Sequence, residues 1–286
     1  MAWCGDRLIL VPQYPAMFKN EGQASVFAIP KADIEAYLDG SSAGPIEPAM
    51  IPFDAGDLTK KIDGFEGFEA VTFDGDTVYM TIESRDGNAM VGYLVKGSVT
   101  GDCAGIVLDA DVMTPIQPQA DLSNMTDETI IVFGDRIYTV YEANGVNVNP
   151  DPVAHVFTLD LEPVGETPFP SIEYRVTDAT VPDTDGLVWA INYFYPGDTK
   201  LKPGTDEIAV QYGLGESHQE MEQVERLVAL QITDEGIVFA GIAPIYLELD
   251  PSLDDSRNWE GLVRFGEGFL LVTDEYPTTI LGYVER

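Results

Sequence analysis

The stretch NWEGLVRFGEGFLLVTDEY, residues 258–276, repeats a pattern that also occupies residues 67–84, GFEAVTFDGDTVYMTIES. Each copy has a leading glutamate, a short apolar run, a turn of glycine and an acid, and a second apolar run that closes on an acid. Two β-branched and aromatic runs around a glycine–acid turn predict a β-hairpin. A repeated hairpin predicts an all-β repeat architecture.

Three units show this pattern clearly, and they run from Glu69 to Glu83, from Glu128 to Glu142 and from Glu260 to Asp274. A weaker unit covers residues 179–193. The N-terminal GDRLILVPQY supplies a fifth unit, which we expect to lack its first strand. Third and fourth strands are predicted after most hairpins, and the segment IEYRVTD (172–178) is expected to be the fourth strand of its unit.

Groups of four antiparallel strands that recur along a chain predict a β-propeller. Five blades divide the 286 residues into about 57 residues each, and six blades remain an alternative. We expect a single domain over residues 1–286. One short helix is predicted at 30–40, where Pro30 and Gly40 supply its start and stop. The long polar segment at 194–224 is predicted to be an inserted loop at the rim.

The chain is strongly acidic, with 49 Asp and Glu against 15 Lys and Arg and a net charge of −34. This charge argues against binding to nucleic acid or anionic lipid, and it favours bound cations or adaptation to high salt. No apolar run reaches the ~18 residues of a membrane span. We expect a monomeric protein that is secreted, periplasmic or at the cell surface, with its signal segment outside this sequence.

Two cysteines, Cys4 and Cys103, can form one disulfide or stay free, and the sequence leaves both alternatives open.

The leading acids of the repeats are the first candidate site. The innermost strand of each blade lines the central channel of a propeller, so Glu69, Glu128 and Glu260 are expected to converge there. In the weaker unit Asp183 and Asp185 lie near the corresponding point. Converging carboxylates must take up protons or share a cation, and hard oxygen ligands suit calcium. The sequence therefore predicts a calcium ion in the channel, with either a structural or a catalytic role.

Further candidates lie on predicted loops. Asn147, Asn149 and Asp151 alternate in a way that could surround a second cation, although turns use the same residues without a metal. His218, on the long loop, is the histidine placed for acid–base chemistry at a rim. The aromatic residues that we expect to contact a ligand at the rim are Trp189, Tyr193, Phe194 and Tyr195.

The openings Glu260-Gly-Leu and Glu69-Ala-Val, each followed by a glycine–acid hairpin, resemble the innermost strands of calcium-dependent propeller hydrolases. These are the gluconolactonase and paraoxonase-like group and the propeller phytases with their esterase-like relatives. The resemblance implies that Glu69, Glu260 and also Glu128 ligate calcium, which polarises an ester, lactone or phosphoryl oxygen. The sequence departs from the pattern in two ways: it lacks recognisable Asn ligands of the lactonase type, and basic residues for phosphate are few.

Two functions follow as hypotheses. One is metal-assisted hydrolysis of a small ester, lactone or phosphoester, with His218 or a channel carboxylate activating water. The alternative is a propeller without catalysis that binds a protein, peptide or glycan through its rim loops. A third reading is a salt-adapted scaffold whose acids only hold water.

Overall fold

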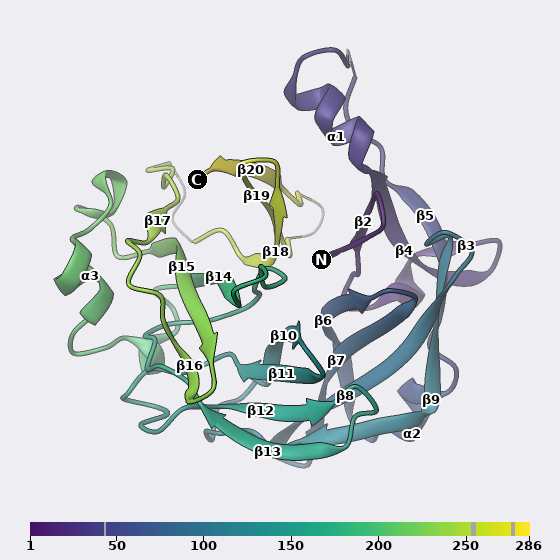
Figure 1. Ribbon diagram of the computed structural model, residues 1–286, viewed down its shortest axis with the longest axis horizontal. Helices are drawn as coiled ribbons and strands as arrows, with labels where there is room; N and C mark the ends of the chain where they lie inside the picture. Colours follow the sequence, from purple (N-terminus) through teal and green to yellow (C-terminus); the bar gives the residue numbers. More distant parts are fainter. Residues whose placement is uncertain (43, 253–255, 276–277) are drawn as a thin grey trace. The chain divides into compact units, whose positions relative to one another are not determined.

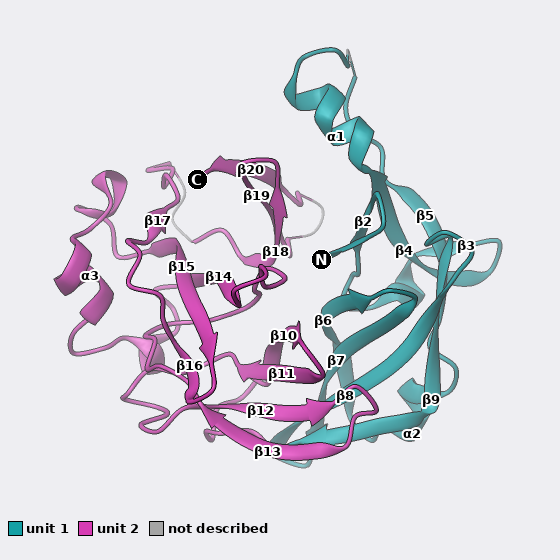
Figure 2. Ribbon diagram, in the orientation of Figure 1, with its two compact units in different colours: residues 1–116 teal, residues 117–286 magenta. Residues whose placement is uncertain are grey.

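A computed structural model describes residues 1–42, 44–252, 256–275 and 278–286 of the chain (Figure 1). Within these residues the chain forms β-sheets and a few short helices. It divides into two compact units, residues 1–116 and residues 117–286 (Figure 2). The prediction of one domain over the whole chain stays a prediction.

Unit 1 contains two antiparallel meanders of four strands, joined by a short parallel pairing of β5 with β9. Its strands are β1 (Ala2–Cys4), β2 (Arg7–Leu10), β3 (Lys19–Asn20), β4 (Gln23–Pro30), β5 (Ala49–Asp54), β6 (Phe65–Asp74), β7 (Thr77–Asp86), β8 (Ala89–Thr100) and β9 (Gly105–Ile116). Its helices are η1 (Pro15–Met17), α1 (Lys31–Leu38) and α2 (Leu58–Lys61). The helix predicted at 30–40 is therefore confirmed as α1.

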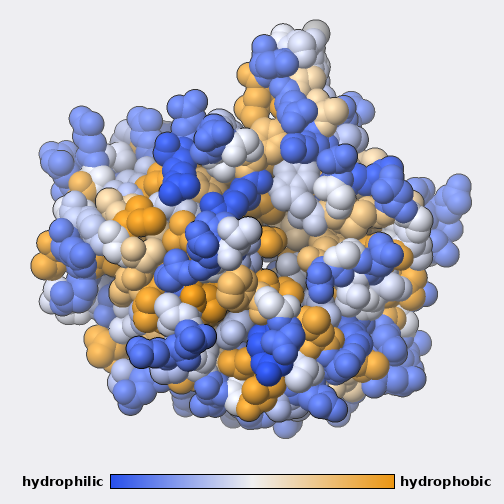
Figure 3. All heavy atoms as spheres, in the orientation of Figure 1, coloured by the Kyte–Doolittle hydropathy of each residue, from blue (hydrophilic) through white to orange (hydrophobic). Residues whose placement is uncertain are grey.

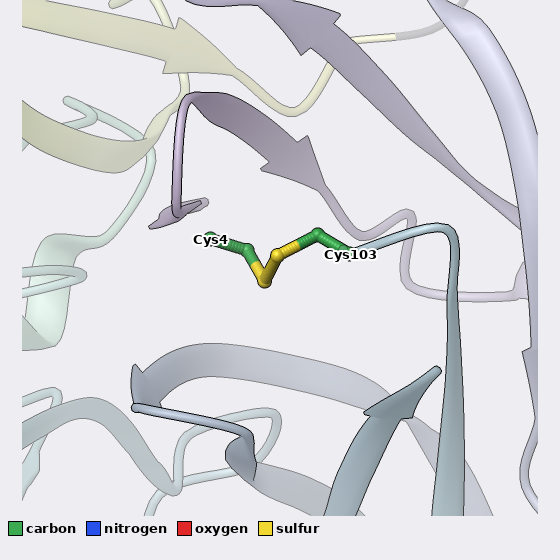
Figure 4. Close-up of a disulfide and its surroundings, with 2 residues drawn as sticks. All are labelled: Cys4 and Cys103. Carbon is green, nitrogen blue, oxygen red and sulfur yellow. A yellow bond between two sulfur atoms is a disulfide. The ribbon is translucent and has the colours of Figure 1, made fainter. Parts of the chain in front are cut away.

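A disulfide joins β1 to the turn between β8 and β9 (Figure 4). Cys4 and Cys103 are 99 residues apart in sequence and 6.0 Å apart between their Cα atoms. Both belong to the buried apolar core of unit 1. A cross-link that closes a loop of this length stabilises a fold by about 4–5 kcal/mol in the chain-entropy picture. Of the two alternatives left open by the sequence, the structure has the paired one.

Unit 2 contains two antiparallel sheets of four strands and one of three. Its strands are β10 (Asp127–Phe133), β11 (Arg136–Tyr141), β12 (Val153–Thr158), β13 (Pro163–Pro168), β14 (Leu187–Phe194), β15 (Val224–Thr233), β16 (Gly236–Phe239), β17 (Ile245–Tyr246), β18 (Trp259–Phe265), β19 (Gly268–Thr273) and β20 (Leu281–Glu285). The connection from β14 to β15 matches the loop predicted at 194–224, and it carries η2 (Thr199–Leu201), α3 (Glu207–Tyr212) and η3 (Glu216–His218).

The predicted hairpin turns are present in both units. Gly75, Gly134 and Gly266 sit between the paired strands with φ of 58°, 62° and 55°. This left-handed conformation is open to glycine at little cost, which explains why each repeat has glycine at its turn.

Two strand predictions were wrong. The N-terminal blade does not lack its first strand, because β1 pairs with β2. The segment 172–178 is not the fourth strand of the blade that starts at β10, since β13 takes that place. Instead, isolated bridges join Arg175 to Tyr193 and Ala179 to Ala190, so residues 175–179 run beside β14 as the inner edge of its sheet. The outer β13 was missed because PVGETP has none of the β-branched alternation that marks a strand.

The predicted fold class is confirmed: the chain is all-β and consists of antiparallel blade-like meanders of the β-propeller type. Hydrophilic residues are numerous on the face shown in Figure 3, in line with the acidic composition. None of the helices in the described ranges has the length and apolar character needed to cross a bilayer.

Candidate functional site

Two inner segments of unit 2, the start of β10 and residues 173–178, carry buried polar side chains, and the start of β18 carries the half-buried Glu260. A buried acid costs free energy unless it is protonated, paired or hydrogen-bonded. The sequence predicted acids at the starts of β10 and β18, and both Glu128 and Glu260 lie there. Glu128 and Glu260 have different neighbours, and these neighbours determine which protonation state each carboxyl group favours.

Glu128 forms a carboxyl pair with Glu142. Glu128, near the start of β10, is 9% exposed, and Glu142, which follows β11, is fully buried. Interaction with Glu128 lowers the pKa of Glu142, so the two carboxyl groups are close neighbours. Ionised carboxylates only accept hydrogen bonds, so two neighbouring carboxyl groups can bond to each other only when one of them carries a proton. We refer to these two residues as the carboxyl pair.

Burial raises the pKa of Glu142, and the charge of Arg175 offsets part of this effect. The Arg175 guanidinium donates from Nη1 to Glu142 Oε1 and, at 2.7 Å, from Nε to Asp198 Oδ2. Burial disfavours the charge on Arg175, but Glu142 and the other neighbouring acids outweigh it and raise the pKa of Arg175. Arg175 therefore stays a cation that fixes one oxygen of the carboxyl pair.

Glu260 has different surroundings. It is only partly buried, and its Oε1 lies 3.2 Å from the hydroxyl of Tyr193 on β14. That hydroxyl also faces Asn258 Oδ1, whose amide is oriented by donation from Nδ2 to the Asp274 carbonyl. Burial, followed by the charge of Glu260, raises the pKa of Tyr193 well above its usual value. The phenol thus remains a donor whose one hydrogen can go to either of two acceptors, Glu260 or Asn258.

Asp178 is a buried acid that the sequence did not single out. Its Oδ1 accepts from the Ala179 amide, and its Oδ2 accepts from the Leu262 amide of β18 at 2.7 Å. Burial raises the pKa of Asp178 to about 6. Asp178 and Arg175 were missed because 172–178 was assigned to an outer strand. The Asp-Gly turn at 185–186, which requires an inner strand immediately before it, was the available signal.

Glu69 belongs to unit 1, where it is partly buried near Gln13, whose Nε2 donates to its Oε1 at 3.2 Å. The convergence of Glu69 with Glu128 and Glu260 on one cation stays a prediction.

Asp183 and Asp185 lie in an exposed turn that leads into β14. Asp183 Oδ1 accepts from the amides of Asp185 and Leu187 at 3.0 and 2.9 Å. The hydrogen bond from Leu187 lowers the pKa of Asp183 despite its slight desolvation. These contacts are those of an Asx turn, which explains both residues without a metal.

His218 lies in η3 and is 3% exposed. Its Nε2 accepts from the Glu225 amide at 3.1 Å, and its ring packs on Tyr246. Burial lowers the pKa of His218, so the neutral ring serves as an acceptor that anchors the loop to β15. A catalytic role for His218 stays a prediction, and these contacts favour a structural one.

Of the four aromatic residues predicted at the rim, Trp189, Tyr193 and Phe194 are each no more than 2% exposed. Only Tyr195, at 40%, offers ring surface to a ligand in this structure. The signal was ambiguous, because aromatic residues in a buried central strand look the same in sequence as aromatic residues at a rim.

The three residues predicted to hold a second metal have different surroundings in the structure. Asn149 Nδ2 donates to Gln119 Oε1 at 3.1 Å, Asp151 is exposed, and Asn147 Nδ2 donates to the Lys200 carbonyl at 2.6 Å. Across the described ranges, no three His, Cys, Asp or Glu side chains gather in a way that would hold a metal ion. The carboxyl pair supplies two such groups, and calcium at the inner strands stays a prediction.

No family model matches the chain. No curated protein matches it either.

The chain resembles a number of solved structures, among them the following two. One is a family 32 β-fructofuranosidase from Bombyx mori, solved as a D63A mutant in complex with sucrose, at 10% identity and a TM-score of 0.49; the match covers 97% of this chain and 54% of that protein. The other is described as a glycoside hydrolase from Parabacteroides distasonis, at 11% identity and a TM-score of 0.47, with coverage of 92% and 78%. This chain thus spans about half the length of the first. Scores below 0.5 assign neither fold nor activity, and the resemblance to calcium-dependent lactonases and phytases stays a prediction.

Proposed function

We propose that unit 2 carries a hydrolytic site for an uncharged polar substrate, a glycoside first and an ester or lactone second. The observation that supports the proposal is the carboxyl pair beside Arg175, together with a differently placed third carboxylate, Glu260. Two carboxyl groups whose surroundings favour opposite protonation states are the usual basis for acid and base roles at neutral pH.

In this proposal Glu128 is the general acid. It is the more exposed member of the carboxyl pair, and it shares a proton with the fully buried Glu142. Glu128 donates that proton to the leaving-group oxygen as the bond to it breaks. Glu142 is a positioning residue, since it acts through Glu128 and is itself held by Arg175.

Glu260 is the general base. Its partial exposure favours the ionised form, and Tyr193 supplies a hydrogen bond to it. Glu260 takes a proton from a water molecule whose oxygen attacks the substrate. After hydrolysis Glu260 loses this proton to solvent, and the carboxyl pair regains one, so the site returns to its starting state.

The charge of the chain supports an uncharged substrate. At −34 the protein repels anions. Arg175, the cation of the site, is already bound by Glu142 and Asp198. A phosphoester would therefore need a cation to bring it in. Calcium at Glu69, Glu128 and Glu260 remains part of the wider proposal, where it would act as a Lewis acid, and no step above depends on it.

Export also remains a proposal. It is supported by the Cys4–Cys103 disulfide, because such cross-links persist mainly in oxidising compartments.

The test is turnover of a panel of aryl glycosides, esters, lactones and phosphoesters by the protein and two variants. Glu128→Gln and Glu260→Gln should each lower kcat by about 10²–10⁴-fold. Asp135→Asn is the matched control, since Asp135 lies in the turn of the same hairpin as Glu128 with a side chain 82% exposed, and its rate should not change. Wild-type rates in both glutamate variants would overturn the proposal. Ligand binding without any turnover would favour the non-catalytic alternative.

A further inference from the structure

The loop that follows β11 closes around Gly145. The amides of Val148 and Asn149 both donate to the Gly145 carbonyl, at 3.0 and 2.8 Å. Glu173, on the inner segment that precedes β14, reaches this loop, and its Oε1 accepts from the Val146 amide at 3.4 Å. The loop is therefore a compact turn with a carboxylate inserted from a different part of unit 2.

Two oxygens in this loop region are buried and lack a hydrogen-bond partner among the residues that the structure describes. They are Glu173 Oε2 and Asn144 Oδ1, on residues that are 7% and 0% exposed. Leaving a buried acceptor without a partner costs about 1–3 kcal/mol, and more for a charged one. A ligand with positive charge beside Glu173 would remove this cost for its Oε2.

Glycine is required at position 145 because there is no room for a side chain. Its φ does not lie in the left-handed region, so its backbone would accept another residue. A Cβ on Gly145, however, would lie 2.3 Å from Glu173 Oε2 and 3.0 Å from Asn147 Oδ1. Two side-chain oxygens from separate segments thus approach the same point beside the Gly145 backbone.

The charges around Glu173 favour a cation. Asp206 and Glu207 add negative charge in the neighbourhood of Glu173. The nearby cation, Arg226, is bound by Asp206 through two hydrogen bonds of 2.8 and 3.0 Å. Arg226 therefore does not neutralise the negative charges of Glu173 and Glu207. Carboxylate and amide oxygens are ligands that suit calcium rather than a softer metal.

We propose that Glu173 and Asn147 bind a calcium-type divalent cation beside Gly145, with backbone carbonyls and water completing its coordination. Because Asn147 Nδ2 also donates to the Lys200 carbonyl at 2.6 Å, the cation ties the loop at 144–149 to the segment between β14 and β15. The site is independent of the proposed hydrolytic site. It retains Asn147 from the loop predicted by sequence and replaces Asn149 and Asp151 with Glu173.

The test uses the full chain, stripped with EDTA and titrated with CaCl2 by calorimetry and by thermal unfolding. Calcium should raise the Tm of the wild-type protein and slow proteolysis within 194–224. Glu173→Gln removes the charged ligand, and Gly145→Ala fills the space between the oxygens; each should weaken calcium binding by about tenfold or more. Asp151→Asn, which removes an exposed acid from the end of the same loop, is the matched control and should bind calcium as the wild type does.

Glu128→Gln separates this site from calcium at the inner strands. It should leave the calcium response intact if the cation binds beside Gly145. The proposal is overturned if CaCl2 gives no heat and no shift in Tm, if Glu173→Gln binds calcium with wild-type affinity, or if Glu128→Gln alone abolishes binding. Circular dichroism checks that each variant folds. If Glu173→Gln does not fold, Asn147→Ala, at an exposed position, takes its place with the same expected loss.

Discussion

The hairpins β10–β11 and β18–β19 share one sequence pattern and hold their acids in opposite environments. In β10–β11 the leading Glu128 contacts the closing Glu142, and both are buried. In β18–β19 the leading Glu260 is partly exposed and lies near Tyr193, while the closing Asp274 is exposed. The same spacing of two acids thus gives two neighbouring buried carboxyl groups in one hairpin and a solvated carboxylate in the other.

The two hairpins differ in the segments that pack against them. The inner segment 173–178 places Arg175 against Glu142 and directs Asp178 to the backbone of β18. Tyr193 of β14 faces Glu260. Neither neighbour is encoded within the repeat itself. Differences of protonation between repeats are therefore a property of the packing of blades, and they can be changed one neighbour at a time.

The largest expected effect is on stability. Arg175→Gln removes the cation that faces the fully buried Glu142, and we expect the free energy of unfolding to fall by about 3–5 kcal/mol. Urea denaturation measures this change. The double variant Arg175→Gln/Glu142→Gln should recover part of the loss, because it no longer buries an unpaired charge. Arg136→Gln, at the first residue of β11 with a side chain 36% exposed, is the control and should change stability by less than about 0.5 kcal/mol. Equal losses in the Arg175 and Arg136 variants would contradict the role given to Arg175.

The next effect concerns pH. Burial raises the pKa of Asp178 to about 6, whereas the unfolded chain titrates near its ordinary value of about 4. Between these values the folded state holds a proton that the unfolded state has released, so this contribution to stability is present at low pH and is lost as pH rises towards 6. The loss should amount to about 2–3 kcal/mol. Burial raises the pKa of Glu142 as well and adds in the same direction.

Urea denaturation from pH 4 to pH 8 checks this dependence in the wild type and in Asp178→Asn. The variant should lose the part of the slope that Asp178 contributes, whatever its absolute stability. Parallel curves for the two proteins would show that Asp178 does not titrate in this range.

A smaller effect is expected at Tyr193. Tyr193→Phe removes the hydroxyl that faces Glu260 and Asn258 while keeping the buried ring. Loss of a hydrogen bond to a charged group costs about 1.5–3 kcal/mol, of which the exposed side of Glu260 should recover part from water. We expect the acidic limb of the pH–rate profile to move up by about one pH unit, with the basic limb unchanged. If the basic limb moved instead, Glu260 would be the general acid and the carboxyl pair would supply the general base.

The smallest effect concerns Asp274 and Glu142, the acids that close the two hairpins. Although Asp274 is exposed, neighbouring groups desolvate its carboxylate enough to raise its pKa, so Asp274→Asn removes a charge that the fold does not favour. Its rate should be that of the wild type, and its free energy of unfolding should be unchanged or slightly higher. Glu142→Gln, the equivalent change in the other hairpin, should lower kcat and broaden the pH profile. If both variants behave alike, the contrast between the hairpins has no functional meaning.

Sequence alone predicted the blades well because their signals are local. Alternating apolar residues and a glycine at each turn are enough to mark β6–β7, β10–β11 and β18–β19. The leading glutamates were also found in this way. The strand assignment failed at 163–178, where the strand β13 has little β-branched character and the inner segment looks like any edge strand.

The surroundings of the site were harder to predict, because they depend on contacts between segments far apart in sequence. Glu142 was visible as a closing acid, but nothing local distinguishes it from Asp274. Its partner in the fold is Arg175, 33 residues further along the chain. Glu173 meets the loop at Gly145 for the same reason, across 27 residues from Val146. Spacing predicts which residue types recur, and tertiary packing decides which of them are charged.

The disulfide of unit 1 also imposes an order on biosynthesis. Cys4 is made before its partner, which lies 99 residues later in the turn between β8 and β9. At about 5–20 residues per second, the chain grows for roughly 5–20 seconds before the second thiol exists. During that interval β1 and β2 have only non-covalent partners, and the first thiol is available to any oxidant or disulfide isomerase it meets. The cross-link that secures the N-terminal strand can therefore form only after most of unit 1 has been synthesised. It stabilises a unit that is nearly complete and does not initiate the folding of that unit.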